Sequence, residues 1–101
     1  MTQETYERFV EENWTGPKTI EFTEIGLGGE AGEVLNEIKK ELRDGSHRQE
    51  QVLLELGDTL HYLVHLSRLY GYTLSDVMAS NISKLMRRQE VVKTSMCGTE
   101  V

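Results

Sequence analysis

The chain has 101 residues, enough for one domain but too few for two independent hydrophobic cores. Its 17 acidic residues outnumber its 11 Lys and Arg residues, so the formal net charge is -6. We therefore expect no nucleic-acid partner and no anionic membrane partner, because both select for basic patches. The single cysteine rules out an internal disulfide and a cysteine-based metal site.

No stretch of the sequence has the character of an export signal or a membrane span. The start at Met1–Glu4 is polar, and no apolar run approaches the roughly 20 residues of a membrane helix. We expect a soluble protein of the cytoplasm. Hydrophobic residues make up 38% of the chain, which is thin for a monomer of this size and favours a homo-oligomer.

Helical periodicity divides most of the chain into four segments, and two of them lie before residue 45. The first covers about residues 2–13 and ends before Gly16 and Pro17, which both break helices. The second begins near residues 19–23 and runs to Arg43. Its apolar positions recur at helical spacing and predict a core stripe of Ala31, Val34, Leu35, Ile38 and Leu42.

The third segment is expected to be a buried central helix. Ser46 and Gln49 predict a capping box at its start, and the helix is expected to run to Tyr70. Leucine and valine occupy most of its circumference. The three other helices of one subunit cannot cover an apolar surface of that extent. We therefore expect a second chain to cover part of it, through Leu53, Leu54 or Val64.

The fourth segment begins at Thr73, an expected N-cap, and runs to about Gln89. Four helices with short connections predict an all-α fold, an antiparallel four-helix bundle that is oligomeric. Residues 1–90 would form this helical domain. Residues 91–101 show no periodicity and are expected to form a flexible C-terminal tail.

The first half of the second segment is unusually rich in glycine. Each glycine inside a helix costs about 0.5–1 kcal/mol relative to alanine, so a run of them needs a reason. The pattern predicts that either a neighbouring helix or a substrate approaches this backbone closely. The glycines are Gly26, Gly28, Gly29 and Gly32.

Two acidic pairs stand out, because residues three positions apart share one face of a helix. They are Glu30 with Glu33 on the second segment and Glu55 with Asp58 on the third. Solvated surface charge is one explanation, and a salt bridge to Lys or Arg is another. A carboxylate on an apolar helix is costly unless it is paired or bound to a metal. The four acids therefore predict an oxygen-only site for Mg²⁺, with Mn²⁺ as a substitute.

The fourth segment carries the complementary charges. Asn81, Lys84 and Arg88 share one face, and Lys and Arg bind phosphate oxygens as a point charge and as a fork. An ordinary solvated basic face is the alternative. His61 and His65 lie four residues apart on the third segment, but without a third ligand they are expected to be packing or rim residues.

Three motifs, taken in chain order, are distinctive as a set. They are Gly26-Leu27-Gly28-Gly29-Glu30-Ala31-Gly32-Glu33-Val34, Glu55-Leu56-Gly57-Asp58 and Asn81-Ile82-Ser83-Lys84-Leu85-Met86-Arg87-Arg88. The set resembles the MazG-like nucleoside triphosphate pyrophosphohydrolases, whose signature is E-x-x-E followed by E-x-x-D. Here 21 residues separate Glu33 from Glu55, within the range usual for that family. The resemblance covers residues 6–89.

The resemblance implies an all-α protein that assembles as dimers or tetramers, with sites near subunit interfaces. It implies hydrolysis of a nucleoside or deoxynucleoside triphosphate to the monophosphate and pyrophosphate, by attack of water at the α-phosphate. By position, Mg²⁺ and catalysis would depend on Glu30, Glu33, Glu55 and Asp58. Contacts to the metal-bound phosphates would come from Asn81, Lys84 and Arg88.

Base recognition is not defined by the resemblance. Trp14, Tyr62 and Tyr70 are candidates for stacking on a base, and ordinary core packing is the alternative for each. Two other functions stay open. One is a related pyrophosphohydrolase acting on phosphoribosyl-ATP or an alarmone-type nucleotide. The other is a non-catalytic helical dimer module with a structural metal site.

Overall fold

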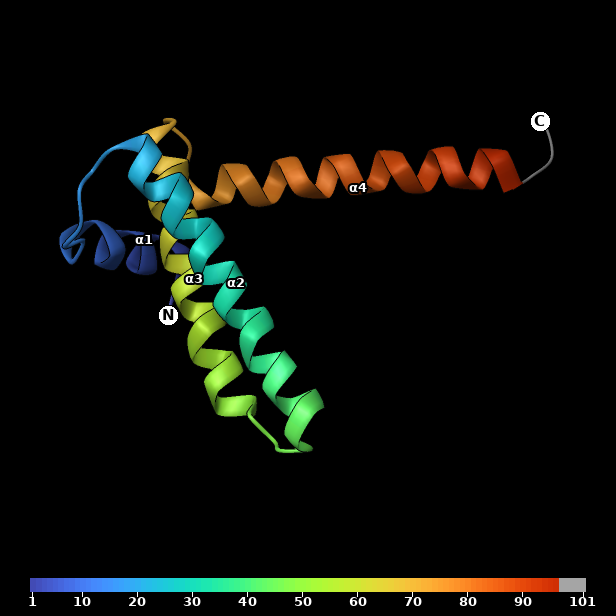
Figure 1. The fold of residues 1–101 in the computed structure, drawn as a ribbon. Helices are drawn as coiled ribbons and strands as arrows, with labels where there is room; N and C mark the ends of the chain where they lie inside the picture. The colour runs from blue at the N-terminus through green and yellow to red at the C-terminus, as the bar shows by residue number, and fades with distance from the viewer. Residues whose placement is uncertain (97–101) are drawn as a thin grey trace.

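The computed structural model describes the backbone of residues 1–96 and the side chains of residues 1–90 (Figure 1). All regular structure in that range is helical, which confirms the all-α class. The helices are α1 (Gln3–Glu12), α2 (Ile20–Asp44), α3 (Gln49–Leu69) and α4 (Leu74–Met96). None of them is long and apolar enough to cross a membrane. The expected end of the fourth helix near Gln89 is too early, and Cys97, in the predicted tail, lies outside the described residues.

Local capping explains where three of the helices begin. The hydroxyls of Thr2 and Thr19 each accept a backbone N–H from three residues further on, at the starts of α1 and α2. At α4 the N-cap prediction is confirmed. The side chains of Thr73 and Asp76 each bond the other residue's backbone N–H, at 3.0 and 2.9 Å.

The start of α3 differs from the prediction. Ser46 does not cap the helix, and its buried hydroxyl has no hydrogen-bond partner. The backbone N–H of Arg48 instead donates to the carboxylate of Glu41, 2.8 Å away. The Arg48 guanidinium also bonds both oxygens of Glu37 at 3.2 Å, which lowers the pKa of that carboxyl. Two acids at the end of α2 therefore fix the start of α3.

α2 and α3 lie side by side as a helical hairpin (Figure 1). They are in close contact at Gly26, where an added Cβ would collide with the ring of Tyr62. An added Cβ at Gly28, Gly29 or Gly32 would meet no atom within 4 Å. Tight helix packing therefore accounts for Gly26, whereas the other three glycines leave open surface along α2.

The buried core lies where α1 packs against the second half of α3. Val10 and Val64 are at most 1% exposed there, together with His65 and with Thr23 of α2. His65 Nδ1 lies 2.8 Å from a carboxylate oxygen of Glu11, which ties α1 to α3. The expectation that Val64 faces a second chain is therefore wrong, because α1 already covers this side of α3.

Much of the apolar surface of the hairpin faces outward. Leu35 and Leu42 on α2 are 68% and 82% exposed, and Leu53 and Leu54 on α3 are 69% and 67% exposed. The core stripe predicted for α2 and the central position predicted for α3 are therefore wrong for a single chain. Periodicity identifies an apolar side of a helix, but it does not tell which chain covers that side.

α4 projects away from the hairpin (Figure 1), and every side chain from Met78 to Glu90 is exposed. The radius of gyration is 17.8 Å, against about 13 Å for a compact domain of this length. One chain therefore does not form the predicted antiparallel four-helix bundle. The sequence specified four helices with short connections, but the direction of the last helix depends on tertiary contacts at its start.

Glu7 of α1 supplies the main contact at the start of α4. Its buried carboxylate accepts a hydrogen bond from the backbone N–H of Leu74 at 2.8 Å, and the same oxygen lies 3.8 Å from the guanidinium of Arg68. An acid is favoured at this position, because the first N–H groups of a helix are unpaired and carry partial positive charge. α1 and α3 together therefore fix the direction in which α4 leaves.

The glycines of α2 provide a matched test of this packing. We expect Gly26→Ala to lower the free energy of unfolding by about 1–3 kcal/mol, because the new methyl group must displace the Tyr62 ring. Gly29→Ala should raise it by about 0.5–1 kcal/mol, because its position is open and alanine favours helix. Urea denaturation at one fixed protein concentration measures both. Equal effects of the two substitutions would contradict the close approach.

Candidate functional site

Three of the predicted carboxylates converge where α2 and α3 face each other. One oxygen from each of Glu30, Glu55 and Asp58 lies within 4.8 Å of the other two. Glu30 follows Gly26 by one helical turn on α2, and Asp58 precedes Tyr62 by one turn on α3. The contact between Gly26 and Tyr62 therefore places the two acidic pairs opposite each other.

The cluster carries negative charge that no ion pair offsets among the side chains of residues 1–90. None of the four predicted acids forms an ion pair with another side chain in residues 1–90. Burial raises the pKa of Glu30 and of Glu55, and the charges of Asp58 and Glu33 raise both further. Such a group of hard oxygen ligands could bind a divalent metal, since a cation would relieve this repulsion.

Glu33 influences the cluster through its negative charge, but its carboxylate does not meet those of the other three acids. Its side chain is exposed and is not among the three oxygens that meet. It nevertheless contributes to the raised pKa values of Glu30 and Glu55. The charge of Lys40 lowers the pKa of the Glu55 carboxyl, but burial and the neighbouring acids outweigh it, so the pKa stays raised. Because Glu33 is exposed, the cluster is open toward solvent on that side.

Tyr6 of α1 lies beside the cluster, which the sequence did not reveal. Burial raises the pKa of its phenol, and the negative charge of Asp58 raises it further. In the sequence Tyr6 lies in the first helical segment, far along the chain from the acids of the second and third segments. Only the packing of α1 against α3 brings its hydroxyl into the field of the carboxylates, and no spacing along the chain encodes that contact.

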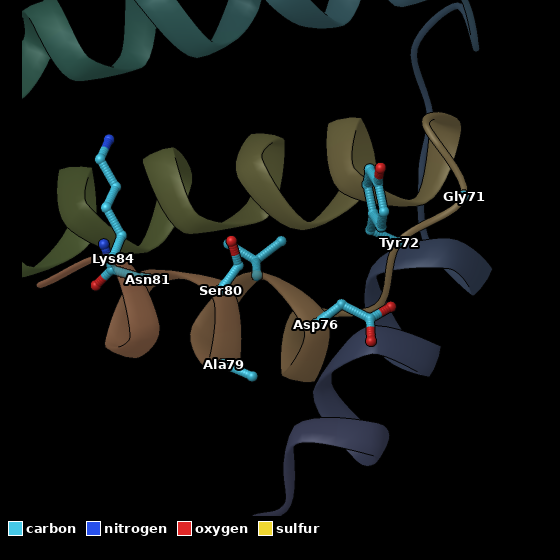
Figure 2. Close-up of a pocket in the computed structure, with 8 residues that line it drawn as sticks. Gly71, Tyr72, Asp76, Ala79, Ser80, Asn81 and Lys84 are labelled. Atoms are coloured by element: carbon cyan, nitrogen blue, oxygen red, sulfur yellow. The ribbon is translucent and has the colours of Figure 1, made fainter. Parts of the chain in front are cut away.

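The predicted phosphate-binding residues lie in a different place. Asn81 and Lys84 line an open pocket of about 820 Å³ on the first turns of α4, together with Tyr72. Figure 2 shows both side chains on α4 itself, at the end of the pocket away from Tyr72. None of the four carboxylates lines this pocket, and Arg88 lies one turn further along. A single chain thus keeps its acidic and basic candidates apart.

The aromatic candidates pack mainly on one another. Trp14 stacks on His61 and His65, with ring centroids 5.0 and 3.8 Å apart, and meets Tyr62 edge-on at 5.1 Å. Both histidines are therefore packing residues, as predicted. Tyr70 stands apart from this cluster, is 56% exposed, and donates a hydrogen bond to a glutamate of α2.

Residues 18–93 match the family model of the MazG nucleotide pyrophosphohydrolase domain. The chain belongs to this family. Over 76 residues it is 34% identical to the Gene 37 protein of Mycobacterium phage L5. The aligned stretch covers 70% of this chain and 67% of that protein. No solved structure shows a significant match. The stretch matched by the MazG model contains the carboxylate cluster and the basic residues of α4, but not α1.

Removing one negative charge from the cluster should stabilise the metal-free protein. At pH 7 and without divalent ions, we expect Glu55→Gln to melt at a higher temperature than the wild type, because the raised pKa means that ionisation of Glu55 opposes folding. The difference should disappear as the pH falls through that raised pKa, since the wild-type carboxyl is then neutral too. Calorimetry across pH measures the difference.

Glu12→Gln is the matched control, because it makes the same chemical change at an exposed site on α1. Its melting temperature should stay close to that of the wild type throughout. A Glu55→Gln protein that melts below the wild type in metal-free buffer would show that this carboxylate makes a stabilising ion pair.

Proposed function

We propose that this protein hydrolyses nucleoside triphosphates, of the ribose or deoxyribose type, to the monophosphate and pyrophosphate. The observation that carries the proposal is the convergence, within 4.8 Å, of three carboxylates from two helices that form no ion pair with any side chain of residues 1–90. Membership of the MazG nucleotide pyrophosphohydrolase family supports the same reaction class. Raised carboxyl pKa values at this point fit a site that is completed by a cation.

In this proposal the carboxylates hold Mg²⁺, and Mn²⁺ can replace it. The donor set fits these ions, because it consists of carboxylate oxygens with no histidine or cysteine among them. A bound ion of this kind neutralises phosphate charge and makes a coordinated water more acidic. The residues that would hold it are Glu30, Glu33, Glu55 and Asp58.

The chain's own groups would carry the rest of the reaction. A glutamate of the cluster accepts a proton from the attacking water, whose oxygen bonds to the α-phosphorus. The bond from that phosphorus to the bridging oxygen breaks, and pyrophosphate leaves. Lys84 and Arg88 offset the charge on the leaving group, and Asn81 beside them donates hydrogen bonds to phosphate oxygens.

We further propose that the base stacks against the aromatic cluster of Trp14 and Tyr62. Tyr62 lies one turn after Asp58 on α3, so this cluster adjoins the carboxylates. The edge-on contact between the two rings and the stacking on His61 and His65 hold the surface rigid. Rigid aromatic faces bind planar bases with little loss of conformational freedom.

The reaction is expected to require Mg²⁺ or Mn²⁺ and to yield pyrophosphate plus monophosphate. Chromatography of products from a panel of nucleotides, including phosphoribosyl-ATP and an alarmone, identifies the substrate class. Asp58→Asn should reduce kcat by at least about 10²-fold while the protein stays folded. Full activity in excess EDTA would contradict the metal proposal, and metal binding without turnover of any nucleotide would favour a structural metal module.

We also propose that the protein is a homo-oligomer, a dimer or a tetramer. The exposed leucines of α2 and α3 support this, since soluble monomers rarely display apolar patches of such extent. Sedimentation at low micromolar concentration should give at least twice the 11.6 kDa chain mass. A stable monomer under these conditions would refute this part of the proposal.

A further inference from the structure

Lys40 places a positive charge at one end of the carboxylate cluster. It follows Glu33 by two helical turns on α2, so the two residues share one flank of that helix. Side chains of a helix lean toward its N-terminus, and the Lys40 ammonium lies 3.6 Å from an oxygen of Glu37, about one turn earlier. Its charge also lowers the pKa of Glu55, against the larger raising effects of burial and neighbouring acids. Lys40 therefore lies beside the cluster, whereas the predicted phosphate-binding cations lie on α4.

The ion pair between Lys40 and Glu37 is not needed to compensate the charge of Glu37. The guanidinium of Arg48 already bonds both oxygens of that carboxylate at 3.2 Å. The 3.6 Å contact of Lys40 is longer than a hydrogen bond, and the lysine side chain is 34% exposed. Ion pairs of such exposed lysines contribute little to stability. The Lys40 ammonium can therefore turn to another anion without leaving a buried charge unpaired.

The flank of α2 that carries Glu33 and Lys40 is open. Glu33 is exposed, and an added Cβ at Gly29, one turn before it on this flank, would meet no atom within 4 Å. At about 100° per residue in the two helices of a hairpin, Asp58 and His61 of α3 face the same side of the hairpin. An extended ligand can therefore lie along this side, in contact with both helices.

Three features follow one another along this side of the hairpin. The aromatic cluster of Trp14 and Tyr62, proposed above for the base, lies one turn from Asp58. The carboxylates, where the α-phosphate would react, come next. Lys40 comes last, toward the turn between α2 and α3, which lies at the end of the hairpin away from α1 (Figure 1). A nucleotide with its base on the aromatic cluster therefore directs its outer phosphates toward Lys40.

We propose that Lys40 binds the terminal phosphate of a nucleoside triphosphate held by the same hairpin, and thereby makes the site prefer triphosphates to diphosphates. This inference rests on the proposed function for the positions of the base and the α-phosphate. The ammonium exchanges its contact with Glu37 for the γ-phosphate. Lysine suits this role, because its charge sits on a flexible stem that can follow a terminal phosphate. A diphosphate bound in the same way ends one phosphate short of Lys40.

The contact acts on the phosphate farthest from the reacting bond, which predicts a specific kinetic effect. A remote contact of this kind is made alike before and during the reaction, and such uniform binding lowers KM without changing kcat. Loss of Lys40 should therefore raise KM for triphosphates by about 10-fold or more and leave kcat near the wild-type value. Any cleavage of diphosphates should keep its wild-type constants.

Nucleotide binding tests the contact without reference to turnover. Triphosphates with a methylene group between the α- and β-phosphorus cannot be cleaved there, and calorimetry in Mg²⁺ compares them with the matching diphosphates for the four common bases. Lys40→Gln should weaken binding of the triphosphate analogue by about 10-fold or more and leave that of the diphosphate analogue unchanged. Lys40→Arg retains a cation and should retain the preference. Equal losses for both analogues, or no loss for the triphosphate, would overturn the proposal.

Lys39→Gln is the matched control, because it removes the same charge from the neighbouring position of the same helix. Lys39 is exposed and lies about 100° around α2 from Lys40, on the side that faces away from α3. Its substitution should change neither affinity. A loss equal to that of Lys40→Gln would show a general effect of net charge and would overturn the proposal. Thermal melts of both variants check that the hairpin stays folded.

The inference and the proposed function fail in different ways. A wild type that prefers the triphosphate analogue through Lys40, but cleaves no nucleotide, would reject the proposed reaction and support the phosphate contact. Turnover of triphosphates with the same KM in the wild type and in Lys40→Gln would support the reaction and reject the contact. A wild type that binds none of the triphosphate analogues would also reject the contact.

Discussion

Because Gly26 has no side chain, the ring of Tyr62 lies directly against the backbone of α2, and this contact sets which turns of the two helices face each other. Four residues further along α2 lies Glu30, and four residues back along α3 lies Asp58. Equal steps from one contact bring the two acids together. The geometry of the carboxylate cluster is thus a consequence of helix packing one turn away, and the acids themselves repel one another.

The hairpin has an unusual distribution of polarity. Polar groups lie between its helices, including the half-buried Glu30 and Glu55 of the cluster and the ion pair of Glu37 with Arg48. Many of its leucines face outward. Burial of polar groups costs free energy that hydrogen bonds and ion pairs only partly offset. The apolar side chains that could stabilise such a hairpin lie on its outside, and no helix of the same chain packs over them. A single chain therefore has an extended shape.

The parts of the structure that sequence reasoning predicted depend on short stretches of chain. The caps at Thr73 and Asp76 and the sharing of one helix face by Glu30 and Glu33 each involve residues three positions apart. The parts it missed depend on distant residues. The contact of Glu7 with Leu74 joins positions 67 residues apart, and Tyr6 approaches the acids only after α1 has packed. Periodicity identifies apolar positions of α2 and α3, but the prediction that they are buried in a single chain is wrong, because burial depends on contacts that periodicity does not encode.

The position of Trp14 also determines which structural changes tryptophan fluorescence can detect in this protein. It is the sole tryptophan, and its indole lies flat against the imidazole of His65 at 3.8 Å while its N–H donates to the carbonyl of Pro17. Fluorescence excited at the long-wavelength edge of the protein's absorption spectrum therefore comes from Trp14 alone, at the junction between α1 and α3. Separation of that junction would change the emission even if the α2–α3 hairpin stayed folded. The protein carries an intrinsic probe of the helix that lies outside the family match.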